Sequence, residues 1–312
     1  MRILRKREGQ LLVVVICIVL FLSFSSSAFL TISNLKALAM GMTYSLLVAL
    51  GMTVILILGG IDLSVGSNLA LTSVVMALLL RNTDISTPIV VIIGLGLATS
   101  IGFVNGLVVT KFKINPFIVT LGMLSITRGV ARVLTSGFFV TKLPDTFLLI
   151  GRGNLFGIPI PVIASVTFVV FFDFLLRRWG PLHKAFYVGS HPDNATLFGI
   201  HTSRMIIVGF MLSGLFAGLS SLFMTSHLAM GYAQFGAGME LTAIAAAVLG
   251  GASMFGGQGS IWGTFLGVLL IALTTNGLAL LDVSIYWQQV VIGLILAIAV
   301  ATSAYQAQKQ RT

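Results

Sequence analysis

The chain has 312 residues, of which 57% are apolar and 8% are charged, and its formal net charge is +10. Soluble domains carry roughly 25% charged residues, so this composition excludes a soluble enzyme and indicates an integral membrane protein. A positive net charge in such a protein is typical of basic residues that flank membrane spans, so we expect a lipid bilayer and no nucleic acid as its partner.

Long continuous apolar runs predict spanning helices rather than a β-barrel, whose strands alternate apolar and polar residues. A span needs about 20 apolar residues. The sequence predicts ten spans, at 11–24, 39–58, 65–80, 88–110, 117–135, 160–176, 204–226, 239–253, 260–280 and 285–304. The expected fold class is an all-α polytopic membrane protein with about ten transmembrane helices, some of them broken or short.

Four of these spans carry particular features. The first follows a basic start and contains Cys17, which we expect to face lipid or to pack as a small apolar residue. We interpret this span as retained rather than cleaved as a signal peptide, because many spans follow it. Segments 65–80 and 239–253 are short and flanked by glycines, and two arginines, Arg128 and Arg132, interrupt 117–135.

The basic residues predict the orientation. With the N-terminus inside, four of them fall outside: Lys36, Arg81, Lys142 and Arg152. Twelve fall inside: Arg2, Arg5, Lys6, Arg7, Lys111, Lys113, Arg177, Arg178, Lys184, Arg204, Lys309 and Arg311. Because basic residues are enriched in cytoplasmic segments, both termini and the polar loop 177–203 are predicted to be cytoplasmic.

The segment 59–66, GGIDLSVG, predicts a broken helix between two spans. Its glycines end one helix, and Asp62 and Ser64 can cap the next by accepting free backbone N–H groups. Transporters often bind their substrates at such breaks, although a tight turn between spans is an alternative. We predict a translocation path formed by Gly59, Gly60, Asp62, Ser64, Gly66, Asn68, Asn105, Glu240 and Asn276.

Two short motifs hint at an internal repeat. LGG occurs at 58–60 and 249–251, and Asn-Gly-Leu occurs at 105–107 and 276–278, although the spacing between the motifs differs in the two halves. Glycine pairs at 102/106, 214/218, 259/263 and 263/267 predict close helix packing. Asp173 lies four residues before Arg177, which predicts local ion pairing at a membrane edge.

The loop 177–203 contains a short predicted helix. Ser190 can cap its start, Pro192 suits its first turn, and Gly199 suits the position after its end. Leu197 and Phe198 place apolar side chains on the predicted cytoplasmic side. Such side chains dock either on a partner protein or on the membrane surface.

The sequence lacks the patterns of nucleotide and metal chemistry. It has no G-x-x-x-x-G-K-[ST] phosphate loop, no H-E-x-x-H motif and no Cys/His cluster with zinc-ligand spacing. We therefore expect no enzyme activity, no cofactor and no metal on this chain.

Six stretches resemble the permease subunit of bacterial ribose-type, simple-sugar ATP-binding-cassette importers. They are GGIDLSVGS (59–67), NGLVV (105–109), KINPFIVTLGMLSITRGVA (113–131), FYVGSHPDNATLFGI (186–200), ELTAIAAAVLGGASMFGGQGSIWGT (240–264) and NGLALL (276–281). With the spans between them they cover nearly the whole chain. The chain departs from the family pattern at Thr242, where an acidic residue is frequent, and at 190–195, where the family often has a Gly-Asn-x-Glu-Ala type run.

The resemblance implies an importer permease fold in the bacterial inner membrane, with residues 1–312 as one transmembrane domain. It implies three protein partners: a second permease subunit, identical or different, an ABC ATPase and a periplasmic sugar-binding protein. The implied substrate is a pentose, a hexose or a related furanose. The family's coupling segment matches 186–200, within the loop 177–203. The resemblance therefore assigns ATPase contact to Gly189, Asp193, Asn194, Ala195, Leu197, Phe198 and Gly199.

Three other functions remain open at this point. An ion-coupled secondary transporter would use Asp62 and Glu240, the acidic residues within or beside spans, although helix capping explains them equally well. A branched-chain amino-acid permease of the same importer class would differ in its binding protein. A non-transporting membrane scaffold would give no reason for the broken helices.

Overall fold

The computed structural model describes the backbone of residues 7–309 and the side chains of residues 8–301. The described chain is almost entirely helical. The elements are α1 (Arg7–Ser25), α2 (Ile32–Ile57), α3 (Val65–Asn82), α4 (Thr87–Phe112), α5 (Pro116–Thr135), α6 (Asp145–Arg152), β1 (Asn154–Leu155), β2 (Ile158–Pro159), α7 (Ile160–Arg178), α8 (Gly180–Ser190), α9 (Pro192–Leu197), α10 (Thr202–Leu228), α11 (Met239–Leu249), α12 (Ile261–Leu280) and α13 (Ile285–Lys309).

The predicted fold class is confirmed, since each of the ten predicted spans corresponds to a helix. Within the described residues, eight helices are long and apolar enough to cross a membrane. The other two are α11 and the apolar stretch 285–301 of α13, which are shorter. The predicted span 239–253 is cut down to the 11 residues of α11. At 1.5 Å per residue α11 is about 16 Å long, so it does not cross a core of about 30 Å.

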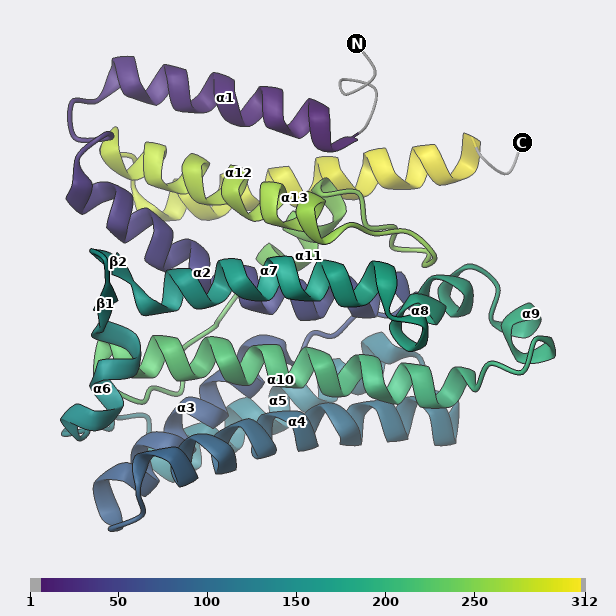
Figure 1. Cartoon of the computed structure of the whole chain (residues 1–312), viewed down its shortest axis with the longest axis horizontal. Coiled ribbons are helices and arrows are strands. Elements are labelled where there is room, and N and C mark those ends of the chain that lie inside the picture. Colours follow the sequence, from purple (N-terminus) through teal and green to yellow (C-terminus); the bar gives the residue numbers. More distant parts are fainter. Residues whose placement is uncertain (1–6, 310–312) are drawn as a thin grey trace.

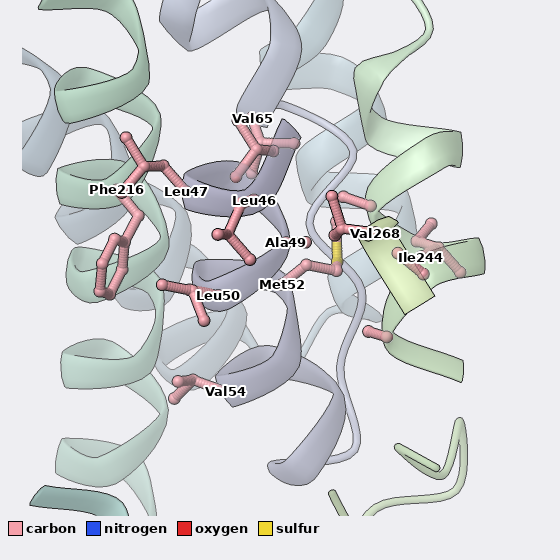
Figure 2. Close-up of a cluster of buried hydrophobic side chains, with 14 of the residues drawn as sticks. Leu46, Leu47, Ala49, Leu50, Met52, Val54, Val65, Phe216, Ile244 and Val268 are labelled. Atoms are coloured by element: carbon pink, nitrogen blue, oxygen red, sulfur yellow. The ribbon is translucent and has the colours of Figure 1, made fainter. Parts of the chain in front are cut away.

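The bundle is built around α2, which is apolar on all sides, as expected for a helix surrounded by protein. Over its most apolar stretch 83% of its residues are buried. Helices α7, α10, α11 and α12 all contact it. Figure 2 shows this core, with the following side chains labelled: Leu46, Leu47, Ala49, Leu50, Met52 and Val54 of α2, Val65 of α3, Phe216 of α10, Ile244 of α11 and Val268 of α12.

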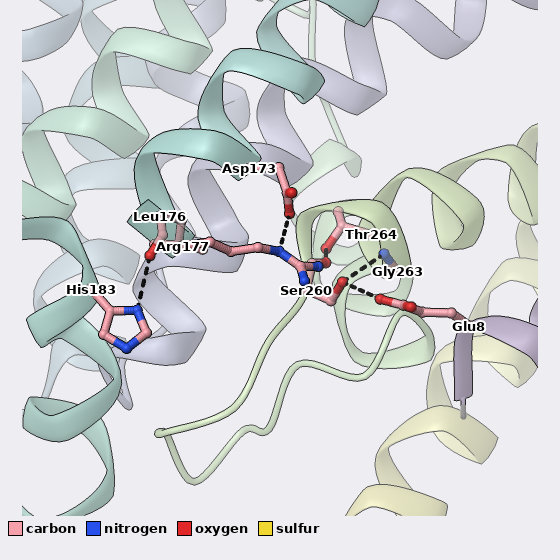
Figure 3. Close-up of polar contacts among 8 residues, drawn as sticks. All are labelled: Glu8, Asp173, Leu176, Arg177, His183, Ser260, Gly263 and Thr264. Atoms are coloured by element: carbon pink, nitrogen blue, oxygen red, sulfur yellow. Dashed lines mark hydrogen bonds and ion pairs between the residues drawn. The ribbon is translucent and has the colours of Figure 1, made fainter. Parts of the chain in front are cut away.

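Helix α1 lies at the edge of the bundle and packs along α12 (Figure 1). Its Glu8 accepts a hydrogen bond of 2.5 Å from the hydroxyl of Ser260, which also caps α12 by accepting from the N–H of Gly263 (Figure 3). The same view shows the predicted ion pair, in which Arg177 Nε lies 2.8 Å from Asp173 Oδ1. Cys17 is a free, exposed cysteine, in agreement with its predicted place on a lipid-facing helix.

The helices run roughly side by side and give the bundle two distinct ends (Figure 1). One end carries α8 and α9 together with the start of α1 and the end of α13. The other end carries α6 and the small antiparallel hairpin β1–β2. The predicted loop 177–203 contains α8 and α9, and the connection between α5 and α7 contains α6, β1 and β2. The predicted orientation groups the two termini with 177–203, although four of its basic residues, Arg2, Arg5, Lys6 and Arg311, lie outside the described residues.

Glycines allow backbones to touch where α4 packs on α10. A Cβ atom on Gly102 would lie 2.1 Å from the carbonyl oxygen of Phe210, and one on Gly214 would lie 2.3 Å from that of Ala98. The glycines at 263 and 267 bring α12 equally close to α11. The close packing predicted from the glycine pairs is therefore confirmed at these two interfaces.

Gly102→Ala is expected to destabilise the bundle, because the added methyl group forces α4 away from α10. Overpacking of this kind costs about 1–3 kcal/mol. Gly96→Ala is the matched control, since Gly96 is on the same helix with no atom within 4 Å of its Cβ position. The apparent melting temperatures of the two purified variants in detergent test this, and equal values would contradict the packing account.

Candidate functional site

The predicted helix break follows α2 directly. The N–H of Gly59 donates to Leu56 O and the N–H of Gly60 donates to Ile55 O, both at 2.9 Å. Gly59 has a φ of +81°, a left-handed conformation that glycine adopts without strain. These two bonds satisfy carbonyl groups that the helix end would otherwise leave unpaired.

Asp62 holds the chain after the break. Its Oδ1 accepts from the backbone N–H of Ser64 at 3.0 Å and from the Ser64 hydroxyl at 2.6 Å. Its Oδ2 accepts from the hydroxyl of Ser213 on α10 at 2.8 Å. Asp62 is 1% exposed, and no basic group among the described side chains lies within 4 Å of it. The carboxylate therefore bonds to the chain's own backbone and hydroxyl groups.

Ser64 differs from its predicted role. It occupies the N-cap position of α3, but its side chain makes no capping hydrogen bond. The hydroxyl instead donates to Asp62 and accepts from Asn105 Nδ2 of α4 at 2.9 Å. The prediction that Ser64 caps α3 through its side chain is wrong, because the hydroxyl is turned toward Asp62 and its oxygen accepts from Asn105 rather than from a backbone N–H of α3.

The polar residues around the break bond to neighbouring helices. Asn68 Nδ2 donates to Ala98 O of α4 at 3.0 Å, and Thr127 of α5 donates to the Ser67 hydroxyl at 2.7 Å. Asn68, Ser67 and Asn105 are at most 1% exposed. The structure thus joins Asp62, Ser64 and Asn105 in one buried network, whereas the side chain of Asn68, one turn along α3, bonds separately to α4.

A second irregular segment, 229–238, crosses the break before α11 begins. A Cβ on Gly66 would lie 2.2 Å from Gly236 O and 2.5 Å from Glu240 Oε2, so only glycine fits there. Arg128 of α5 points into the protein, and its Nη1 donates to the carbonyls of Ala233 at 2.7 Å and Phe235 at 2.8 Å.

Sequence reasoning assigned no role to Arg128, which is 9% exposed. Its position in the sequence nevertheless indicated a structural or functional role, because a charged side chain within a span is costly unless it faces other protein groups. Glu240, at the start of α11, attracts Arg128 electrostatically. Its Oε2 is buried and accepts no hydrogen bond from the described residues.

Asn276 lies apart from this network. Its side-chain amide pairs reciprocally with that of Asn34, at 2.8 and 3.2 Å, and joins α12 to the start of α2. The structure therefore places Asn276 and Asn105 in different environments, although each of them begins a copy of the tripeptide Asn-Gly-Leu.

The loop 177–203 contains α8 and α9. Gly199 has a φ of +74°, and the N–H of Ile200 donates to Ala195 O at 3.0 Å, so the predicted end of the short helix is confirmed. The predicted first turn is confirmed, since α9 begins at Pro192, but the predicted cap is wrong: Ser190 ends α8 and donates to Phe186 O, and His191 is the N-cap residue of α9.

The surface of α9 is apolar at its tip. Leu197 and Phe198 are each 85% exposed, whereas Ala195 is buried. A hollow of about 460 Å³ lies between α8 and α9 and is lined by Tyr187, Ser190, His191, Asn194, Ala195, Phe198 and Ile200. Asp193 and Asn194 are exposed beside it.

Glycines seat the end of α8 against the helix break. A Cβ on Gly189 would lie 1.7 Å from Ile57 O, the last residue of α2. That carbonyl accepts a 2.8 Å hydrogen bond from the N–H of Gly257, in the loop that joins α11 to α12. A Cβ on Gly256 would lie 2.3 Å from Gly189 O. Three segments thus meet through backbone atoms at one point.

The chain is similar in sequence to known transport proteins over most of its length. Residues 33–300 match the model of the family described as branched-chain amino acid transport system / permease component. The chain is 37% identical to the ribose import permease protein of Bacillus subtilis over 91% of this chain and 88% of that protein. It is 34% identical to the L-arabinose transport system permease protein of Escherichia coli over 91% of this chain and 86% of that protein. No solved structure matches the chain.

Two substitutions of Asp62 distinguish between a structural role and a proton-carrying role for its carboxylate. Asp62→Asn keeps an acceptor for both Ser64 bonds, and the Ser213 hydroxyl can turn to accept from the new amide. Asp62→Leu leaves three donors without this acceptor, at about 1–3 kcal/mol for each buried donor. We expect Asn to retain substantial transport and Leu to lose it together with protein yield. Uptake assays and yields test this; equal inactivity of two well-folded variants would favour ion coupling.

Proposed function

The chain belongs to the family of branched-chain amino acid transport system permease components, and we propose that it is the membrane-spanning subunit of an ATP-driven, binding-protein-dependent importer of a simple sugar. The observation that carries this proposal is the similarity to ribose and arabinose permeases over nearly the whole chain. The broken helix, the second crossing segment and the exposed α9 are features that such a subunit uses.

A sugar is favoured over a branched-chain amino acid, the substrate class in the family's description. The relatives named above, at 34–37% identity, are sugar permeases. An amino acid also carries an ammonium and a carboxylate, which call for charged partners along a path. Of the described charged residues within or beside the spans, Asp62 and Arg128 are instead occupied by bonds within the chain, and Glu240 is attracted to Arg128.

The ATPase belongs on a separate subunit in this proposal, because the sequence has no phosphate loop. The segment from Gly189 to Gly199 is its docking site, with Leu197 and Phe198 as apolar contacts and Asp193 and Asn194 as polar ones. Ala195 packs inside and holds α9 in place. Because α8 touches the end of α2 through Gly189, movement of the docked segment reaches the helix break directly.

The end of the bundle with α8 and α9 faces the cytoplasm in this proposal. It carries most of the basic residues counted as inside, whereas the opposite end carries Lys36, Arg81, Lys142 and Arg152. The opposite end then receives sugar from a periplasmic binding protein. A second permease subunit, identical or different, completes the pore.

The proposal is tested by uptake into reconstituted vesicles that contain the chain with its ATPase, with ATP inside the vesicles and the binding protein outside. Radiolabelled ribose, arabinose and leucine are offered separately. We expect uptake of a sugar that requires ATP and the binding protein and persists with an uncoupler at constant ATP. Uptake that collapses with the uncoupler would favour the ion-coupled alternative, and leucine uptake alone would favour the amino-acid permease.

Leu197→Asp is expected to abolish ATP-driven uptake without loss of membrane insertion, because a charge replaces an exposed apolar contact of the coupling segment. Leu197→Met is the matched control and should retain uptake, since it keeps the apolar contact. The measurements are co-purification of the ATPase and uptake by the same preparations. Normal uptake and normal complex yield with Leu197→Asp would show that α9 is not the docking site.

A further inference from the structure

A cleft of about 410 Å³ lies between α2, α11, α12 and α13. Its polar lining side chains are uncharged and come from all four helices: Ser45, Thr242, Thr275, Asn276 and Gln288. The remaining lining residues are apolar or glycine, and no charged residue is among the described residues that form its walls. Apolar walls with a few convergent polar groups are typical of small-molecule sites.

The hydroxyl groups on the cleft wall retain hydrogen-bonding capacity. None of the hydrogen bonds between described residues involves the hydroxyl of Ser45. Thr242 donates to Gly238 O at 3.2 Å and Thr275 donates to Ile271 O at 3.1 Å, so both oxygens keep free lone pairs. The cleft therefore offers acceptors to a ligand that carries several hydroxyl groups.

The amide groups on the wall are held in place. Asn276 is fixed by its reciprocal pairing with Asn34, and Gln288 Nε2 donates to Val283 O at 3.1 Å. A side-chain amide has two donor hydrogens and two acceptor lone pairs, so each group can make further hydrogen bonds. Because these amides are already fixed, the protein loses little side-chain entropy when a ligand binds to them.

The position of the cleft is also informative. Apart from Thr242 at the start of α11, its walls come from 37–45 in the first half of α2, from 268–276 in the middle and second half of α12, and from 288–292 at the start of α13. All three lie toward the end of the bundle that carries α6 and the hairpin, opposite α8 and α9 (Figure 1). In the proposed orientation this is the end at which substrate arrives.

We propose that this cleft is a weak binding site for a neutral monosaccharide on the entry side of the permease. Hydroxyl and amide groups bind the sugar hydroxyls, and the apolar walls pack against its C–H surface. Weak binding suits a site that must release its ligand onward. This inference rests on the proposed sugar import and adds the residues that contact the substrate: Ser45, Thr242, Thr275, Asn276 and Gln288.

A blocking substitution tests the cleft. Gly41 lies on its wall with no atom within 4 Å of its Cβ position, so Gly41→Phe fills the cleft without a backbone clash. Gly293→Phe is the matched control, because Gly293 is equally open and does not line the cleft. In the complete importer, we expect Gly41→Phe to abolish sugar uptake while ATP hydrolysis stimulated by the loaded binding protein persists.

A second pair of variants tests one polar group of the cleft, because valine has nearly the same shape as threonine but lacks the hydroxyl. Thr275→Val should reduce sugar uptake about threefold to tenfold, as expected for one lost hydrogen bond. Thr274→Val is the control, since Thr274 makes the same type of helix bond to Leu270 O and lies outside the cleft. Unchanged uptake by both Gly41→Phe and Thr275→Val, with wild-type uptake normal, would overturn the cleft site alone. No sugar uptake by the wild type would overturn the proposed function as well.

Labelling gives a readout that does not depend on transport. A Gly41→Cys variant in a Cys17→Ser background is treated with a membrane-impermeant maleimide from the periplasmic side. We expect labelling that millimolar amounts of the transported sugar slow and that leucine leaves unchanged. No labelling would mean that lipid or a second copy of the chain fills the cleft, and labelling that sugar does not slow would mean that no sugar binds; either result would overturn the proposal.

Discussion

Unpaired backbone groups are the constraint on which this structure depends. A chain surrounded by hydrocarbon must satisfy its N–H and C=O groups internally, so irregular segments are tolerated only where protein surrounds them. Two irregular segments lie inside this bundle, at 58–64 and at 229–238. Asp62 accepts from the backbone after the first break, and Arg128 donates to two carbonyls of the second. Asp62 and Arg128 thus supply hydrogen bonds that a continuous helix would otherwise make.

Both LGG motifs lie at the end of a helix, where backbone carbonyl groups need hydrogen-bond donors. Both α2 and α11 end with the same pair of backbone hydrogen bonds and a glycine of positive φ, but that glycine is Gly59 in the first motif and Gly251 in the second. It is the second residue of one LGG and the third of the other, so the motifs are out of register by one residue. The two helix ends are alike in geometry, whereas Asn105 and Asn276 are not in equivalent environments.

The apolar runs predicted a helix at each of the ten proposed spans, and the glycines predicted the break after α2, because both patterns depend only on residues that are neighbours in the sequence. Gly199 was predictable as a helix end for the same reason. The partners were not predictable. Ser64 was expected to cap α3, but its bonding is set by Asp62 and Asn105, 41 residues away along the chain. The inward direction of Arg128 depends on a segment about 105 residues later in the sequence. Long-range contacts of this kind leave no periodic pattern in the sequence.

Helix α11 joins the cleft to the proposed ATPase docking segment. Its first turn contains Thr242 at the cleft, and its C-cap residue Gly250 lies about 12 Å further along the helix. The following loop bonds through Gly257 to the last carbonyl of α2, and through Gly256 it touches Gly189 of α8. These contacts join backbone to backbone, with no side-chain rotamer between them to absorb a displacement. If the docked ATPase moves α8, as the proposed function requires, the shift acts on the end of α2 and on the loop after α11 together, and α11 then carries the second of these movements to the wall of the cleft.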